Sequence, residues 1–204
     1  MRDTTENTSK IIPRWEWRTF NADDELLKSK LSNYQPLLDA ESIETYLLVP
    51  DEELNLKIRH HILDVKHRLK LDSTGQEQWL PIINIKFPLD VAALNKIEEL
   101  LDMSFSSATN ERSLSEANFI ELLAQEPHIA AVSVAKFRQK YEIEGIQGEF
   151  TKLQIDNHYL FTLALEHEDP GRILNIRKSL GLEKCISENY PEALKHAIAT
   201  GKGD

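Results

Sequence analysis

Glycine and cysteine are scarce in this chain, and each scarcity argues against certain kinds of binding or catalytic site. The 204 residues include 7 glycines, and none of them builds the G-x-G-x-x-G or G-x-x-x-x-G-K-[ST] loops that cradle dinucleotides and nucleoside phosphates. Any phosphate group that the protein binds must therefore be held by side chains. The one cysteine, Cys185, cannot form an internal disulfide. Without a neighbouring base it is also a poor nucleophile.

Long apolar runs are missing as well. No segment approaches the roughly 18 consecutive apolar residues of a membrane span. Residues 1–10 (MRDTTENTSK) lack the apolar stretch of a secretory signal. We therefore expect a cytoplasmic protein without a membrane partner, in which residues 1–10 form a disordered tail and residues 11–204 form one domain.

Positive charge is in the minority. The chain has 24 lysines and arginines against 34 aspartates and glutamates, so its formal net charge is −10. This balance argues against a general DNA-binding surface or a coat for anionic membranes. The hydrophobic content of 41% is sufficient for the core of one medium-sized domain.

Two-residue alternation of apolar and polar side chains predicts a mainly antiparallel β structure. The predicted strands are residues 11–20, 42–48, 55–61, 62–71, 77–85, 131–143, 149–155 and 158–168. Turn signals at residues 73–75 and 145–148 join consecutive strands as hairpins. Helical spacing predicts helices within residues 23–38, 88–103, 115–125, 170–180 and 190–199. The second and third of these helices form an insert around residues 88–126.

The polar faces of these strands collect much of the positive charge. The predicted faces carry ten of the 24 basic residues, namely Arg14, Arg18, Lys57, Arg59, Lys66, Arg68, Lys70, Lys136, Arg138 and Lys140. They carry only five of the 34 acidic residues, which are Glu16, Asp64, Glu149, Glu166 and Glu168. An excess of five positive charges on one set of faces, in a chain of net charge −10, predicts a concave basic lining that suits a polyanion. Trp15 and Trp17 lie opposite this face, where a helix is expected to cover them.

The acidic residues of these faces suggest a binding site for a divalent metal. Glu166 and Glu168 are spaced i and i+2 on one strand face, and Mg²⁺ and Mn²⁺ commonly bridge such carboxylates to substrate phosphates. Basic clamps with such a metal are the parts that phosphoryl transfer requires. The histidines show no metal-ligand spacing such as H-E-x-x-H and are expected to serve packing or the surface.

Five short motifs, in order along roughly residues 13–196, resemble the CYTH superfamily of triphosphate tunnel metalloenzymes. RWEWR at 14–18 resembles its E-x-E-x-K strand, KIR at 57–59 its R-x-R strand, DVK at 64–66 its lysine strand, KFR at 136–138 its later basic strand, and EHE at 166–168 its final E-x-E. Arg14 stands where the family has its first glutamate, and Arg18 stands where it has lysine.

The resemblance implies an α+β fold, with an eight-stranded antiparallel barrel that forms a triphosphate tunnel and has flanking helices. It implies that phosphates are bound by Arg14, Arg18, Lys57, Arg59, Lys66, Arg68, Lys136 and Arg138. It also implies that Mg²⁺ or Mn²⁺ is bound by Glu16, Glu149, Glu166 and Glu168. Glu16 and Lys66 are the residues to which we assign catalytic roles.

The predicted function is metal-dependent hydrolysis of a small molecule that carries a triphosphate group: inorganic triphosphate, thiamine triphosphate or a nucleoside triphosphate. The alternative is a binding module for polyphosphate or a nucleotide without turnover, which the replacement of a glutamate by Arg14 favours. A third hypothesis is a structural barrel whose charged faces are only solvated. The clustering of cations argues against it. Cyclisation, the organic part of the substrate and the oligomeric state stay open.

Overall fold

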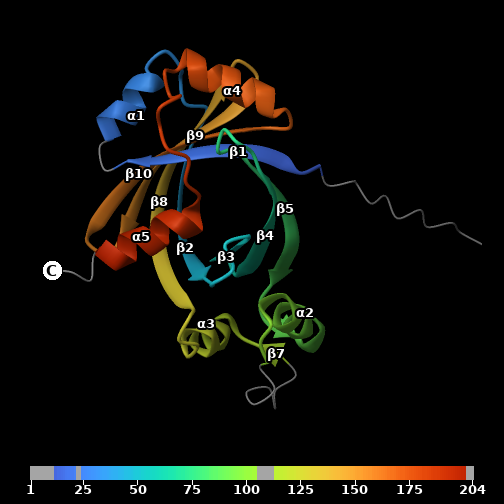
Figure 1. The fold of residues 1–204 in the computed structure, drawn as a ribbon. Helices are drawn as coiled ribbons and strands as arrows, with labels where there is room; N and C mark the ends of the chain where they lie inside the picture. The colour runs from blue at the N-terminus through green and yellow to red at the C-terminus, as the bar shows by residue number, and fades with distance from the viewer. Residues whose placement is uncertain (1–11, 22–23, 105–112, 201–204) are drawn as a thin grey trace, which may run out of the picture.

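Eight antiparallel strands close into a barrel in the computed structural model, which describes residues 12–21, 24–104 and 113–200 (Figure 1). The barrel strands are β1 (Arg14–Asn21), β2 (Leu38–Leu48), β3 (Leu54–Arg59), β4 (Ile62–Leu71), β5 (Glu77–Lys86), β8 (Ala130–Ile143), β9 (Ile146–Ile155) and β10 (His158–His167). Their order is β1-β10-β9-β8-β2-β3-β4-β5, and pairing of β1 with β5 closes the ring. The predicted eight-stranded antiparallel barrel is confirmed.

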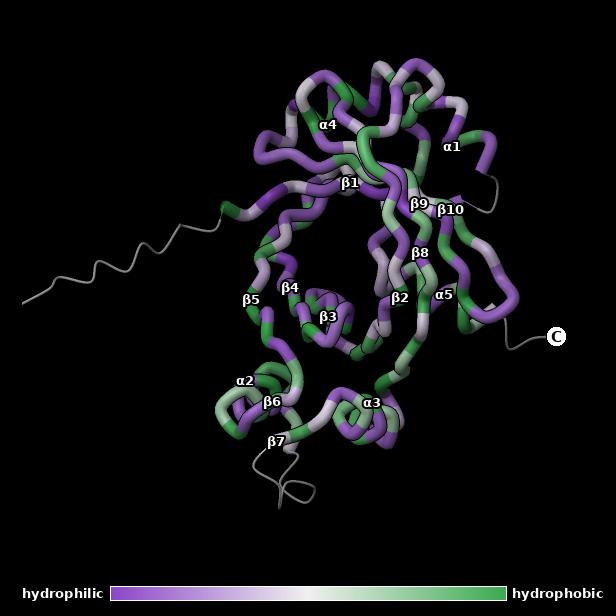
Figure 2. The backbone as a smooth tube through the Cα atoms, turned by 180° about the vertical axis from the view of Figure 1, so that it is seen from behind, coloured by the Kyte–Doolittle hydropathy of each residue, from purple (hydrophilic) through white to green (hydrophobic). Residues whose placement is uncertain are grey.

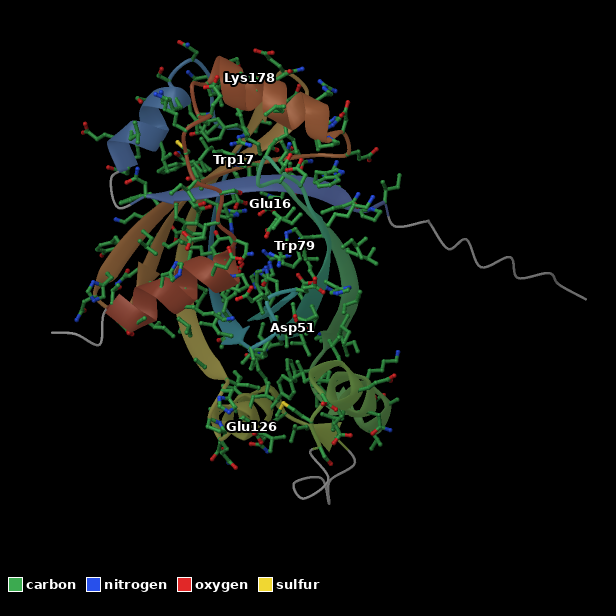
Figure 3. The ribbon with its side chains drawn as sticks, viewed as in Figure 1. Glu16, Trp17, Asp51, Trp79, Glu126 and Lys178 are labelled. Carbon is green, nitrogen blue, oxygen red and sulfur yellow. The ribbon has the colours of Figure 1, made fainter. Side chains whose placement is uncertain are left out.

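The strands alternate between the two faces of the barrel wall. In β3, Leu56 and Ile58 are buried on the outer face, whereas Lys57 and Arg59 point inward and contact a carboxylate of β2. The strand β1 shows the same division in Figure 3, where Glu16 and Trp17 lie on opposite sides of the ribbon. Hydrophilic and hydrophobic residues consequently mix along the barrel wall (Figure 2). The charged faces therefore line the interior, and the apolar faces need a cover.

Helices supply that cover at two places. α1 (Asp24–Lys30) and α4 (Pro170–Ser179) pack on the outer faces of β1, β9 and β10. Trp17 is fully buried there, with the guanidinium of Arg177 4.4 Å from its ring centre, as expected for a residue opposite the charged face. α2 (Val91–Leu101) and α3 (Glu116–Ala124) occupy the segment predicted as a helical insert and pack against the other side of the barrel. The short strands β6 (Leu89–Asp90) and β7 (Ser113–Leu114) pair beside them.

The last helix closes one end of the barrel interior. Tyr190 and Leu194 of α5 (Tyr190–Thr200) pack against the inward-facing Tyr46, Val134 and Leu153. The ring of Tyr190 stacks on that of Tyr46, with centroids 5.3 Å apart, and meets the edge of Phe20 at 5.4 Å. This apolar plug means that a ligand reaches the interior from the opposite end.

Several predicted boundaries differ from the structure. The helix predicted within residues 23–38 ends at Lys30, β2 begins at Leu38 rather than at residue 42, and β9 begins at Ile146 rather than at residue 149. Pro36 keeps the helix from reaching its predicted end, since a proline disfavours helical backbone at the residue before it, and the pairing of Leu38 with Lys140 extends β2. The expected tail, residues 1–10, lies outside the described residues. None of the described helices is long and apolar enough to cross a membrane.

We predict that α5 stabilises the barrel through its apolar contacts. Leu194→Ala should lower the free energy of unfolding by about 2 to 5 kcal/mol, because it leaves a void at the closed end. Urea denaturation followed by circular dichroism measures this loss. As a control, Ile186→Ala should change it by no more than about 0.5 kcal/mol, because that side chain is 82% exposed. Equal effects of the two substitutions would contradict the packing of α5 described above.

Candidate functional site: a charged barrel interior

A buried carboxylate, that of Glu44 on β2, lies at the centre of the charged interior. Its side chain is fully buried and accepts ion pairs from the two neighbouring strands. Lys57 and Arg59 of β3 approach it to 4.0 and 3.3 Å, and Lys136 of β8 lies at 3.0 Å. Arg138 of β8 also pairs with it. Four of the predicted phosphate ligands therefore converge on one carboxylate that the sequence prediction did not include.

These neighbours fix the charge of Glu44. Burial alone raises the pKa of a carboxyl group, but the charges of Lys136, Lys57 and Arg138 outweigh it and hold the pKa of Glu44 well below its usual value. The surroundings of Lys136 disfavour its charged form instead. Its ammonium donates to the hydroxyl of Tyr46 at 2.6 Å and lies 3.5 Å from the ring centre of Tyr190. Burial lowers the pKa of Lys136, and the adjacent cations Lys57 and Arg138 lower it further against the pull of Glu44. Positive charge is in excess around this lysine.

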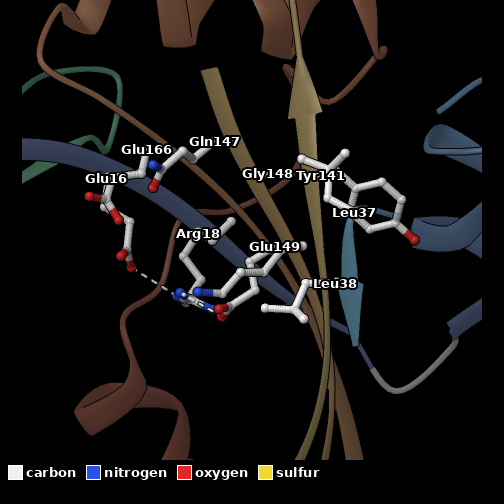
Figure 4. A pocket seen from close by; sticks show the side chains of 11 residues that line it. Glu16, Arg18, Leu37, Leu38, Tyr141, Gln147, Gly148, Glu149 and Glu166 are labelled. Atoms are coloured by element: carbon white, nitrogen blue, oxygen red, sulfur yellow. Dashed lines mark hydrogen bonds and ion pairs between the residues drawn. The ribbon is translucent and has the colours of Figure 1, made fainter. Parts of the chain in front are cut away.

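A second group surrounds Arg18 on β1 (Figure 4). Its Nε donates to Oε1 of Glu16 at 2.8 Å, and its Nη2 lies 3.6 Å from Oε1 of Glu149. The guanidinium also stacks on Tyr190, 4.5 Å from the ring centre. Burial raises the pKa of Glu16, but the charge and hydrogen bond of Arg18, with Lys66 and Lys57 across the barrel, outweigh this and lower it. Both carboxylate and guanidinium are therefore charged.

A cavity of about 330 Å³ opens beside this group. Glu16, Arg18, Glu149 and Glu166 form its charged wall, and Lys140 lines it from β8. The exposed Leu37 and Leu38 stand at its mouth. The cavity thus connects the charged interior to solvent.

Three carboxylates lie side by side across β5, β1 and β10. Glu16 is in register with Glu77 on one side and with Glu166 on the other. Like charges opposite one another on neighbouring strands repel, and each of these carboxylates has its own arginine. Arg68 pairs with Glu77 at 2.7 Å, and Arg14 pairs with Glu166 at 3.1 Å.

Lys66 differs from the other predicted phosphate ligands. Within the described part of the chain, no carboxylate lies within 4 Å of its ammonium group. Its charge acts on Glu16 across the barrel, and its side chain is half-buried. An ammonium group inside a barrel without a carboxylate partner attracts an anion that enters it.

The structure thus divides the predicted site residues by their accessibility. Arg18, Lys136 and Arg138 are buried and fully engaged in ion pairs, whereas Arg14, Lys57, Arg59 and Arg68 are partly exposed. Among the predicted metal ligands, Glu16, Glu149 and Glu166 line one cavity. Glu168 follows the end of β10 and lies away from that cavity wall. The roles assigned to all of these residues stay predictions.

Five interior residues were missed: Glu44, Tyr46, Glu77, Thr162 and Tyr190. Glu44 alternates with Ser42 and Tyr46, which is a strand signal, but Tyr46 and Leu48 make its face of the strand look apolar. Glu77 begins β5 and receives hydrogen bonds from Trp79 and Asn189. Burial raises the pKa of Glu77 despite the bonds from Asn189 and Arg68. Tyr190 enters the barrel from a helix that is distant in the chain, and no local sequence pattern predicts this contact.

The carboxylates do not form a metal site in this arrangement. A divalent metal needs several oxygen ligands at one point in space, at 2.0–2.1 Å in the case of Mg²⁺. Among the described residues, no three side chains of histidine, cysteine, aspartate or glutamate come together in this way. Arg18 stands between Glu16 and Glu149, and Arg14 engages Glu166. The donor set that the resemblance implies is therefore already occupied by guanidinium groups.

Comparison with known proteins gives structural neighbours only. No family model and no curated protein sequence matches the chain. HpAC1 from Hippeastrum, a candidate adenylyl cyclase described as having a dominant triphosphatase activity, superposes with a TM-score of 0.51 at 15% identity over 92% of this chain and 96% of its own. The PH1012 protein of Pyrococcus horikoshii OT3 superposes with a TM-score of 0.50 at 14% identity over 88% of this chain and 98% of its own. The chain therefore shares the eight-stranded barrel fold of these two proteins.

We predict that the charge of Glu44 stabilises this barrel strongly at neutral pH. Glu44→Gln keeps the shape of the side chain but leaves four cations without their carboxylate, which should cost about 3 to 5 kcal/mol at pH 7. Because folding lowers the pKa of Glu44, its contribution is fully present above the unfolded-state value of about 4.3 and is lost progressively as the pH falls from there through the lower folded-state value. Urea denaturation at pH 7 and pH 3 should therefore show a smaller difference at pH 3.

The control for this experiment is Glu142→Gln, whose side chain is exposed near the end of β8. It should change the free energy of unfolding little at either pH. A difference between wild type and Glu44→Gln that is the same at pH 7 and pH 3 would contradict the charged state assigned to Glu44.

Proposed function

We propose that this protein binds the triphosphate group of a small molecule, or the end of a polyphosphate, inside its barrel. The observation that carries this proposal is Lys66, a cation within the barrel that has no carboxylate partner among the described residues. The barrel fold shared with HpAC1, which is described as having triphosphatase activity, supports the same ligand class. The substrate identity and the roles of the individual residues belong to this proposal.

The charge balance of the interior supports an anionic ligand. The eight predicted phosphate ligands face six carboxylates on the same inner surface of the described chain, an excess of two positive charges. These carboxylates are Glu16, Glu44, Asp64, Glu77, Glu149 and Glu166. The whole chain has a net charge of −10. The counted residues thus give the inner surface a positive balance in a chain that is negative as a whole, and low-dielectric walls strengthen the field of such a surface.

The shape of the interior suggests how the ligand lies. α5 blocks one end with Tyr190 and Leu194, and the cavity beside Arg18 opens at the other. A chain of phosphates would therefore enter end first, with its terminal phosphate toward the cations. An organic group would remain near the exposed Leu37 and Leu38 at the cavity mouth.

Hydrolysis of the bound triphosphate is the second candidate function. The observation that favours it is the fold shared with HpAC1. The ion pairs of Glu16, Glu149 and Glu166 with arginines favour binding without metal-dependent turnover. Binding is accordingly the function that the geometry supports best.

We predict that tripolyphosphate binds to the purified protein and that Lys66 contributes to its affinity. Lys66→Met should weaken binding at least about tenfold in isothermal titration calorimetry, because it removes one charge-assisted hydrogen bond. The affinity of wild type should fall as salt is raised, since part of the attraction is screened. Lys70→Met is the matched control, because Lys70 lies on the same strand but is exposed, and it should bind like wild type. Absence of binding by wild type would refute the proposal.

We predict no metal-dependent release of phosphate from this protein. The assay offers tripolyphosphate, thiamine triphosphate and ATP separately, each with Mg²⁺, with Mn²⁺ and with EDTA. If the protein only binds its ligand, no phosphate is released in any of the nine mixtures, since arginines occupy the carboxylates that would hold a metal. Release with Mg²⁺ or Mn²⁺ that stops in EDTA and in a Lys66→Met variant would instead establish the second candidate.

A further inference from the structure

We propose that the guanidinium groups of Arg14 and Arg18 replace a divalent metal in this barrel, so that its anion is bound without metal. That an anion binds in the barrel at all rests on the proposed function. The replacement of the metal rests on the ion pairs alone, and it can be tested without any anion.

The guanidinium of Arg18 lies between the carboxylates of Glu16 and Glu149. Its Nε donates to Glu16 at 2.8 Å and its Nη2 faces Glu149 at 3.6 Å, while its Nη1 donates to the hydroxyl of Thr162 at 3.4 Å. Its side chain is only 7% exposed. The face of the guanidinium rests on Tyr190 of the helix that closes the barrel. All three guanidinium nitrogens and one face of the group therefore have partners, which hold this cation in position.

Arg14 neutralises the third carboxylate of the same cavity. Its Nη1 lies 3.1 Å from Oε1 of Glu166 and 3.2 Å from the side-chain oxygen of Gln147. Arg14 precedes Glu16 by two residues on β1, so both side chains point to the same face of the strand. A carboxylate at position 14 would enlarge the acidic cluster, whereas the arginine cancels part of it.

The row of carboxylates explains why some cation is required here. Glu77, Glu16 and Glu166 lie in register on three neighbouring strands, and such a row is unstable unless positive charge is placed beside it. A bound metal or nearby guanidinium groups can each supply this charge. In this chain Arg68, Arg18 and Arg14 supply it, one for each member of the row.

A metal could enter only by displacing these arginines. Arg18 would have to give up its hydrogen bonds to Glu16 and Thr162 and its contact with Tyr190. If it stayed nearby, its positive charge would repel a divalent ion at short range. The arginines are part of the chain and cannot be removed by a chelator, so binding of the anion should be the same with and without divalent metal.

The first experiment titrates Mn²⁺ into the protein in the absence of any anion, followed by calorimetry and by the electron paramagnetic resonance signal of free Mn²⁺. Wild type should show no saturable binding. Arg14→Glu should bind Mn²⁺ saturably and at least about tenfold more tightly, because it releases Glu166 and adds a carboxylate two residues before Glu16. Arg172→Gln, which changes an exposed arginine of α4 outside the barrel, is the control and should behave like wild type.

Arg18→Met is the second variant, and circular dichroism and thermal unfolding establish whether it folds. A folded Arg18→Met protein should also gain Mn²⁺ binding, since Glu16 and Glu149 lose their cation. Should it not fold, Arg14→Glu still decides the question, because the side chain of Arg14 is 40% exposed and its loss is tolerated more easily. Saturable binding of Mn²⁺ by wild type as tight as that by Arg14→Glu would overturn the proposal.

The second experiment compares tripolyphosphate binding in EDTA and in Mg²⁺. Wild type should bind in EDTA, and Mg²⁺ should change the affinity only as far as it complexes free tripolyphosphate, which a titration of Mg²⁺ into tripolyphosphate alone calibrates. Binding that appears only with Mg²⁺ would overturn the replacement of the metal while leaving the triphosphate ligand intact. No binding in either buffer would refute the proposed ligand, and the Mn²⁺ titration would still decide the role of the arginines.

Discussion

The ion pairs of the buried Glu44 carboxylate allow this barrel to keep its charged faces inside. Lys57, Arg59, Lys136 and Arg138 all contact it, and without it these cations would repel one another across two strands. Burying charge is costly unless each charge is paired and hydrogen-bonded. The outer helices depend on the same arrangement, because they can cover the apolar faces of the strands only while the charged faces point inward.

The interior consists of two regions with different tasks. Around Glu44 the ion pairs are buried and complete, and the aromatic rings of Tyr46 and Tyr190 enclose Lys136. This region is structural, since its cations have little freedom to meet a ligand. Around the cavity beside Arg18 the side chains are half-exposed, and Lys66 faces the interior without a carboxylate partner among the described residues. Lys136 and Arg138, two of the predicted phosphate ligands, are therefore already paired with Glu44, and their role toward an anion stays a prediction.

The sequence predicted the barrel and its inner face but only part of the site. Alternation placed Lys136 and Arg138 correctly on the inner face, because β8 is amphipathic in its second half, from Lys136 to Ile143. Glu44 escaped because the apolar Tyr46 and Leu48 share its face while Leu47 lies on the other, so that apolar residues occur on both faces of β2. The pairing of Arg18 with Glu149 depends on the closure of the barrel, and the contact with Tyr190 depends on the docking of α5. Such contacts join residues that are far apart in the chain, and local patterns do not contain them.

A shared barrel does not oblige its members to share a mechanism. The position two residues before Glu16 decides whether β1 presents a carboxylate or a cation to the cavity, and the choice changes the chemistry without disturbing the strand. Arg14 is partly exposed at the cavity, so its exchange for glutamate alters charge more than packing. Arg18 is different, because its stem and guanidinium are buried and tie β1 to β9, β10 and α5 at once. In this chain the cation that compensates the carboxylates is therefore also one that holds the barrel to its closing helix. A bound metal could provide the charge but not that connection.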